Sequence, residues 1–160
     1  MLTLATDTFI TLTDADAYLG FRLRAHEWGI ASEADKEAAL RMATAMISRE
    51  RFAGRIANQN QALAWPRTGI TDPEGRPVPS NAIPAAIAHA TAELALFLMR
   101  YDITDDRIRR SVFNVRSERI GESAATFDGS GGNDTLPALV RDMIAPYQAV
   151  ASANNARLIP

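Results

Sequence analysis

The residue types that carry enzymatic chemistry are few in this sequence, and their spacing does not suit catalysis. His26 and His89 are the only histidines, and the chain has no cysteine. His89 and Glu93 are four residues apart, as two metal ligands on one helix face can be, but no third ligand follows at a recognisable spacing. No serine lies in a Gly-x-Ser-x-Gly turn. We therefore expect a protein that is not an enzyme and that uses no metal and no cofactor.

Charge is the second property that could support a function, and it is distributed unevenly. The net charge is −2, whereas a general nucleic-acid binder usually has a strong basic excess. Residues 1–40 hold seven acidic and three basic residues, and residues 107–119 hold five arginines and one glutamate. An arginine-rich segment with one nearby ring, Phe113, could contact either DNA or an acidic protein surface. We favour protein contact, and the candidate residues are Arg107, Arg109, Arg110, Arg116 and Arg119.

The C-terminal end is a second candidate contact. Residues 148–160 are mostly small and polar with an apolar tip, which is typical of a tail that orders on a partner. The candidate residues there are Arg157, Leu158 and Ile159. The 160 residues otherwise predict one domain over 1–147. No apolar run approaches the ~20 residues of a membrane span, and the N-terminus has no signal-peptide pattern, so we expect no membrane association.

Periodic apolar residues predict a mainly α fold. Thr13 with Asp16 resembles a capping box and opens a first helix that ends near Gly29. Its apolar positions are Ala17, Tyr18, Phe21 and Ala25. Ser32 with Asp35 opens a second helix that ends at Gly54. Its apolar stripe, which includes both methionines as core residues, is Ala39, Met42, Ala43, Met46 and Ile47.

The third predicted helix, at about 82–101, is apolar on most sides and should be the buried centre of the domain. Asn81 is a good candidate for its N-cap, and Pro84 suits its first turn. β-Branched and aromatic residues predict a β-hairpin at about 111–127, and a last short helix is expected at about 136–145. The predicted fold is a small helical bundle with an appended hairpin and a flexible C-terminal tail.

The segment QALAWPRTG, residues 61–69, places a tryptophan in the long connection between the second and third helices. Pro66 restricts Trp65 to an extended backbone, which can direct the ring at the central helix. Leu63 would point to the same side. We expect Trp65 to be mostly buried. The role of Arg67 stays open between a local acid and a contact with another subunit.

Residues 61–96 resemble the central signature of a phage protein family. Many members of that family are labelled DnaT-like single-stranded-DNA-binding proteins. The signature combines Ala-Leu-x-Trp-Pro-Arg, a glycine turn, Ile-Pro and a helix with Ala-x-x-Glu-Leu-Ala. The residues that carry the motif are Leu63, Trp65, Pro66, Arg67, Gly69, Ile83, Pro84 and Glu93. A shorter stretch, residues 117–127, is similar to a strand motif of phage head-to-tail connector proteins.

These resemblances imply two different functions. A connector would form a ring, typically of twelve copies, beneath the portal protein of the virion. It would extend the DNA channel and present a platform to the next neck or tail protein. We favour this function, with a protein made in the host cytoplasm and located at the head-tail interface of the virion, where packaged DNA passes through without sequence-specific binding. The alternative is a DnaT-like module that binds single-stranded DNA during replication.

Overall fold

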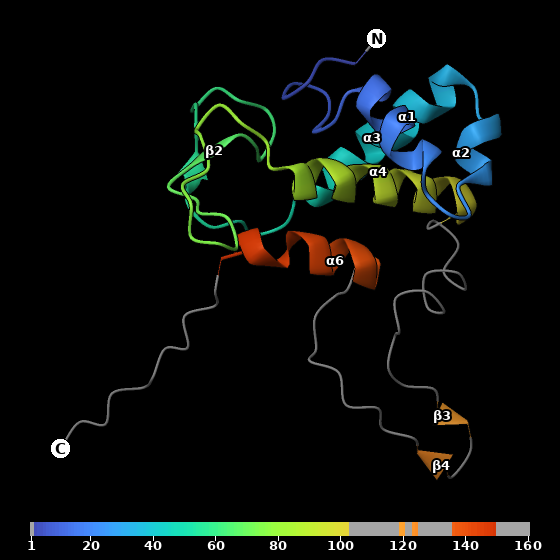
Figure 1. The fold of residues 1–160 in the computed structure, drawn as a ribbon. Helices are drawn as coiled ribbons and strands as arrows, with labels where there is room; N and C mark the ends of the chain where they lie inside the picture. Colours follow the sequence, from blue (N-terminus) through green and yellow to red (C-terminus); the bar gives the residue numbers. More distant parts are fainter. Residues whose placement is uncertain (1, 103–118, 121–122, 125–135, 150–160) are drawn as a thin grey trace.

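The computed structural model describes residues 2–102, 119–120, 123–124 and 136–149, and its described part is mainly helical (Figure 1). The helices are α1 (Leu12–Gly20), α2 (His26–Ile30), α3 (Glu33–Ile47), α4 (Ala85–Arg100) and α6 (Ala138–Ile144), and a 3₁₀ turn (Ala145–Tyr147) follows α6. Two short antiparallel strand pairs accompany them. They are β1 (Arg55–Ile56) with β2 (Arg67–Thr68), and β3 (Arg119–Ile120) with β4 (Ser123–Ala124). The predicted helical bundle with an appended hairpin is confirmed.

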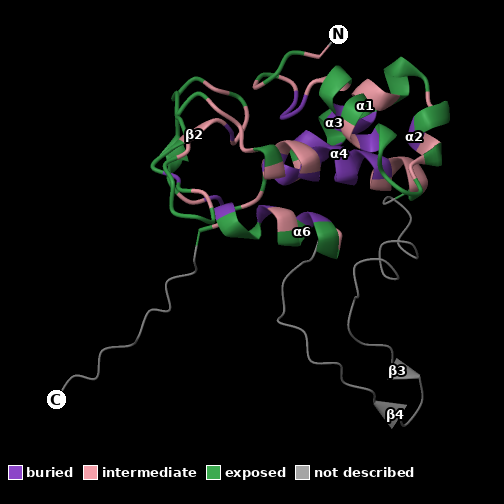
Figure 2. Cartoon of the chain, in the orientation of Figure 1, coloured by how far each residue is buried: buried purple, intermediate pink, exposed green. Residues whose placement is uncertain are grey.

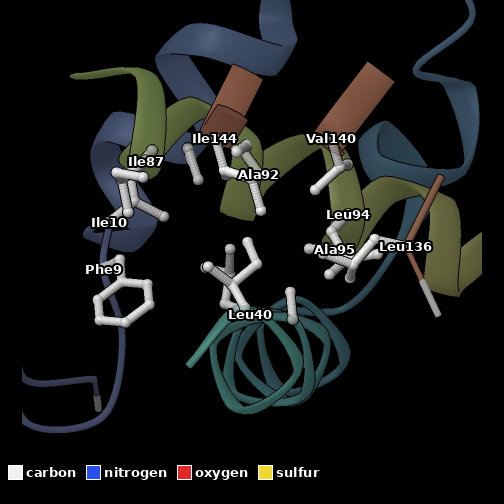
Figure 3. Close-up of a cluster of buried hydrophobic side chains, with 14 of the residues drawn as sticks. Phe9, Ile10, Leu40, Ile87, Ala92, Leu94, Ala95, Leu136, Val140 and Ile144 are labelled. Atoms are coloured by element: carbon white, nitrogen blue, oxygen red, sulfur yellow. The ribbon is translucent and has the colours of Figure 1, made fainter. Parts of the chain in front are cut away.

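The central helix is α4, as its apolar composition predicts. It lies between α3 and α6 (Figure 1), and its residues 90–96 are buried without interruption. Figure 3 shows α4 side chains such as Leu94 meeting Leu40 of α3 and Val140 of α6 in one cluster. The N-cap of α4 is Pro84 and not Asn81. The prediction of Asn81 as N-cap is wrong. The helical conformation is disfavoured at Ile83 because it directly precedes Pro84, so the helix begins only after Pro84.

The first predicted helix is divided in two. Its N-cap is Thr11, whose hydroxyl accepts from the Asp14 amide at 3.1 Å, and α1 ends at Gly20. The predicted capping pair of Thr13 and Asp16 is wrong because Asp16 has tertiary partners. Its carboxylate accepts from Trp28 Nε1 at 2.8 Å and from Lys36 Nζ at 2.9 Å. Sequence spacing alone could not distinguish two Thr-x-x-Asp pairs that lie two residues apart.

The second predicted helix begins as expected and ends early. Ser32 caps α3 by accepting from the Asp35 amide at 3.1 Å, but the helix stops at Ile47, seven residues before Gly54. Met42 was predicted in the core and is 51% exposed. The face of α3 that packs on α4 is centred on Leu40 and Ala43, which places Met42 at its edge.

Residues 49–71 form an irregular segment around the β1–β2 pair, which we call the ribbon. It closes on the rest of the fold through Phe52, whose backbone bridges Gln148. The amide of Ala53 donates to the Tyr147 carbonyl at 2.9 Å, and the amide of Ala149 donates to the Arg51 carbonyl at 2.9 Å. The peptide bond between Trp65 and Pro66 is cis. The ribbon and the end of α6 are therefore one packed unit.

Candidate nucleic-acid interface

Trp65 is the centre of an aromatic cluster and is fully buried, as predicted. Its ring meets Phe52 edge-on, with centroids 5.4 Å apart, and meets Tyr147 edge-on at 5.8 Å. Leu63 is partly buried against the same core. Because all three rings are buried, this cluster fixes the ribbon on α6 and offers no ring to a ligand.

Arg67 is held by backbone carbonyl groups. Its guanidinium donates to Ala53 O at 2.7 Å, Ala64 O at 3.0 Å, Gly54 O at 3.1 Å and Phe52 O at 3.3 Å. Burial lowers the pKa of Arg67 from its usual value. Neither a local acid nor another subunit is needed to explain this residue, since the planar guanidinium ties four carbonyls of the ribbon together.

Glu93, the acidic residue of the signature, is buried beneath the loop that follows α1. Its carboxylate accepts from Arg22 Nε at 2.7 Å and from Tyr18 Oη at 3.0 Å. Burial, followed by the charge of Glu93, raises the pKa of Tyr18, and the hydrogen bond to Glu93 raises the pKa of Arg22. The ring of His89 stacks on Tyr18 with centroids 4.2 Å apart. Glu93 thus pairs with Arg22 and not with His89.

The four residues that follow α1 form an exposed loop, Phe21-Arg22-Leu23-Arg24, which we call the FRLR loop. Phe21 is 95% exposed and Leu23 is 81% exposed. No other described aromatic side chain is exposed to this degree, since the next most exposed aromatic side chain is Tyr101 at 39%. A ring in this position loses the stabilisation that burial would bring, and together with Leu23 it forms an apolar surface open to a ligand.

The FRLR loop is held in place by two arginines. Arg22 donates from Nη1 to the Leu23 carbonyl at 2.8 Å while its Nε bonds Glu93. Arg100, at the end of α4, donates from Nη2 to the Arg24 carbonyl and to Glu27 Oε2, the latter at 2.8 Å. Arg24 has a φ of 60°, a left-handed conformation that costs energy in a residue other than glycine. The loop is therefore preorganised, and its apolar side chains point away from the core.

A shallow hollow of about 140 Å³ lies beside this loop. Arg22, Arg100 and Tyr101 contribute to its wall, and Leu139 of α6 closes another side. Phe97 and Tyr101 have centroids 4.9 Å apart. Exposed rings and arginines, the two components of a single-strand-binding surface, thus occur together at this end of α4.

This site was not predicted from the sequence, because Phe21 has helical spacing from Tyr18 and was assigned to the apolar face of the first helix. Gly20 ends that helix, and the residues after it alternate apolar and basic with a period of two. That alternation was the available signal. A period of two is incompatible with one apolar helix face.

The ribbon provides a second cationic surface, at the opposite end of α4 from the FRLR loop (Figure 1). Arg49, Arg51 and Arg55 are exposed, and none has an ion pair among the residues that the structure describes. Residues 51–71 contain no acidic residue. Figure 2 shows that much of the ribbon's surface is exposed. These arginines are available for phosphate contacts.

The arginines predicted as an interface are not placed by the structure. Arg107, Arg109, Arg110 and Arg116 lie outside the described residues, as do Arg157, Leu158 and Ile159. Arg119 is in β3, but its side chain is not described. Within the described ranges, no group of three or more His, Cys, Asp or Glu side chains could hold a metal ion, and no helix is long and apolar enough to cross a membrane.

Comparison with known proteins identifies the family. The model of the family described as "Putative DnaT-like ssDNA binding protein" matches residues 3–159. The chain belongs to this family. No curated protein and no solved structure matches the chain.

Membership of the DnaT-like family overturns the connector hypothesis. The match spans almost the whole chain, whereas the connector resemblance depended on a short stretch at residues 117–127. The predictions of an adaptor beneath the portal, a ring of twelve copies and a neck or tail partner are therefore wrong. The match favours the alternative, which is binding of single-stranded DNA. The argument from charge failed because net charge averages over the whole surface and does not show that exposed arginines gather on the ribbon.

Proposed function

We propose that this protein is a non-enzymatic module that binds single-stranded DNA and that the FRLR loop is its base-contacting element. The exposed ring of Phe21, held between arginines on a preorganised loop, is the observation that carries this proposal. Phe21 stacks on an unpaired base, and Arg24, which has no ion pair among the described residues, contacts a neighbouring phosphate. Membership of the DnaT-like family supports the same ligand.

The preference for single strands follows from stacking. An unpaired base has a free π-face for Phe21, whereas a base in a duplex is already stacked on its neighbours. Stacking is tolerant of base identity, so we expect little sequence preference. The described FRLR loop offers one fully exposed ring, which suits a weak or moderate affinity per protein molecule.

The ribbon adds phosphate contacts through Arg49, Arg51 and Arg55. With Arg24 these make four exposed arginines without ion pairs among the described residues. Four phosphate contacts to a single strand predict a slope of about −3 for the logarithm of the binding constant against the logarithm of the salt concentration, at roughly −0.7 per contact.

The test is fluorescence anisotropy of a labelled oligothymidine longer than the ~16 nucleotides that one small binding fold covers. We expect binding that weakens with salt and that exceeds binding to a duplex of equal length. Phe21→Ala should weaken single-strand binding by about 1–3 kcal/mol, or roughly 5- to 150-fold. Phe21→Trp should preserve it, because the larger ring also stacks.

Leu4→Ala is the matched control, since Leu4 is 49% exposed and lies outside the FRLR loop and the ribbon. It should leave the affinity unchanged. Phe21→Ala should not alter the thermal unfolding temperature measurably, because the ring is almost fully exposed. Equal affinity of the wild type and Phe21→Ala for the single strand would show that Phe21 is not the stacking residue. Equal binding of single strand and duplex would contradict the proposed ligand.

A further inference from the structure

An apolar groove on the face between α2, α3 and the end of α4 is not used by the proposed DNA site. Its volume is about 490 Å³, and it is lined by Ile30 from α2, Met42 from α3, and Leu98 and Met99 from α4. Ile30 is 71% exposed and Met42 is 51% exposed. Leu98 and Met99 are only partly buried against the core. Core packing therefore leaves a continuous apolar surface open to solvent here.

Exposed apolar side chains that gather in a groove are typical of a binding site for a protein partner. Two of the lining residues are methionines, whose flexible and polarisable side chains adapt to different partners. Three helices bound the groove, and none of the described strands lies against it, so the groove offers no strand edge for a partner to extend. This geometry suits a helix that inserts apolar side chains spaced i, i+3 or i+4, and i+7.

The charge around the groove selects the partner. Glu27 and Asp35 contribute carboxylates to its wall, and exposed Glu33 lies in the first turn of α3. Glu27 is neutralised by Arg100 at 2.8 Å, and Lys36 pairs with Asp16 at 2.9 Å. The charge left beside the groove is that of Asp35 and Glu33, which have no ion pair among the described residues. The negative potential would repel the phosphates of DNA and attract a basic segment. The groove and the cationic surfaces therefore suit different ligands.

We propose that this groove docks a basic amphipathic helix of a partner protein. The apolar face of that helix covers Ile30, Met42, Leu98 and Met99, and its lysines or arginines lie beside Asp35 and Glu33. The protein would then bind single-stranded DNA at the FRLR loop and ribbon and a protein helix at the groove, so that it brings the two together.

The test selects peptides from a displayed library on the full chain. Its readout is peptide binding, which does not depend on the binding of DNA. The library contains peptides of about four helical turns with acidic and basic residues at equal frequency. We expect the enriched peptides to carry a net positive charge and apolar residues at helical spacing. Isothermal titration of the best peptide should show at least tenfold weaker binding to Ile30→Lys and to Met42→Lys, because each replaces an apolar contact with a like charge.

Ile56→Lys is the matched control, since Ile56 is 42% exposed but lies on β1, outside the groove. It should bind the peptide as the wild type does. Enrichment of neutral or acidic peptides, a library that enriches nothing, or equal affinity of Met42→Lys would overturn the proposal. Sedimentation that shows a dimer lost in Met42→Lys would replace the partner helix by a second copy of the chain. Oligothymidine that competes for the peptide site would assign the groove to DNA instead.

Discussion

Replacing Trp65 by alanine tests how the ribbon is attached to the helical core. The ring is fully buried and contacts Phe52 and Tyr147 edge-on. A buried aromatic side chain removes roughly 150–250 Å² from water, which corresponds to about 4–6 kcal/mol at ~25 cal/mol per Å². That value is an upper bound, because the unfolded chain already buries part of this surface.

Two further contributions change the expected loss of stability on Trp65→Ala in opposite directions. Each edge-on ring pair adds about 0.5–1.5 kcal/mol to the loss. The indole Nε1 is buried and has no hydrogen-bond partner among the residues that the structure describes. An unsatisfied buried donor costs about 1–3 kcal/mol, and alanine removes that cost. The expected loss is therefore about 4 kcal/mol, within the usual range for deleting a large buried ring.

The assay is urea unfolding followed by far-UV circular dichroism, with the loss read as a change in the free energy of unfolding. Trp65→Phe is the informative comparison, because it retains a ring and removes the unpaired Nε1. Trp28→Phe is its matched control, since Trp28 is 3% exposed but its Nε1 donates to Asp16 at 2.8 Å. Trp65→Phe should cost less than Trp28→Phe. A loss below about 1 kcal/mol for Trp65→Ala would refute the attachment role, because core deletions of this size cost several times more.

Three other predictions concern the ribbon and the Tyr18 environment. Arg67→Lys should lower the free energy of unfolding by about 2–4 kcal/mol in urea, because an ammonium cannot reach all four carbonyls, whereas Arg55→Lys should change it by less than about 0.5 kcal/mol. The raised pKa of Tyr18 predicts that its contribution to stability is complete below pH 10.0 and is lost as the pH rises through the folded-state pKa, because the tyrosine of the unfolded chain ionises first. In thermal melts at increasing pH, Tyr18→Phe should therefore lose less stability than the wild type. An identical loss in the two proteins would contradict this prediction. The double variant Arg51→Gln with Arg55→Gln should reduce the salt slope of oligothymidine binding by about 1.4, and an unchanged slope would exclude these two side chains from phosphate contact.

The structural features that were predicted correctly share one property, which is that residues close to them in the sequence determine them. Ser32 caps α3 because its hydroxyl reaches an amide three residues away. The apolar run that follows Pro84 predicts a buried helix whatever packs around it. The burial of Trp65 follows from the high cost of exposing an indole ring in the chain's interior connection.

Signals that depend on competition between distant residues could not be resolved from the sequence. Asp16 is unavailable as a capping partner only because Trp28 and Lys36 reach it. Arg67 has the type and position of an interface residue, and only the folded ribbon shows that four carbonyls already engage it. The net charge misled the functional argument in the same way, since it carries no information on where the arginines lie.

The sequence by itself determined the helical class, the central position of α4, the hairpin and the burial of Trp65, because apolar periodicity and capping are encoded within a few residues. Only the tertiary structure decided that Phe21 is exposed on a loop. That outcome depends on Arg22 and Arg100, which hold the loop against Glu93 and Glu27 from more than seventy positions away. A side chain can contact a ligand only if it does not already make contacts within the folded chain. That is a property of the packed chain and not of any segment of it.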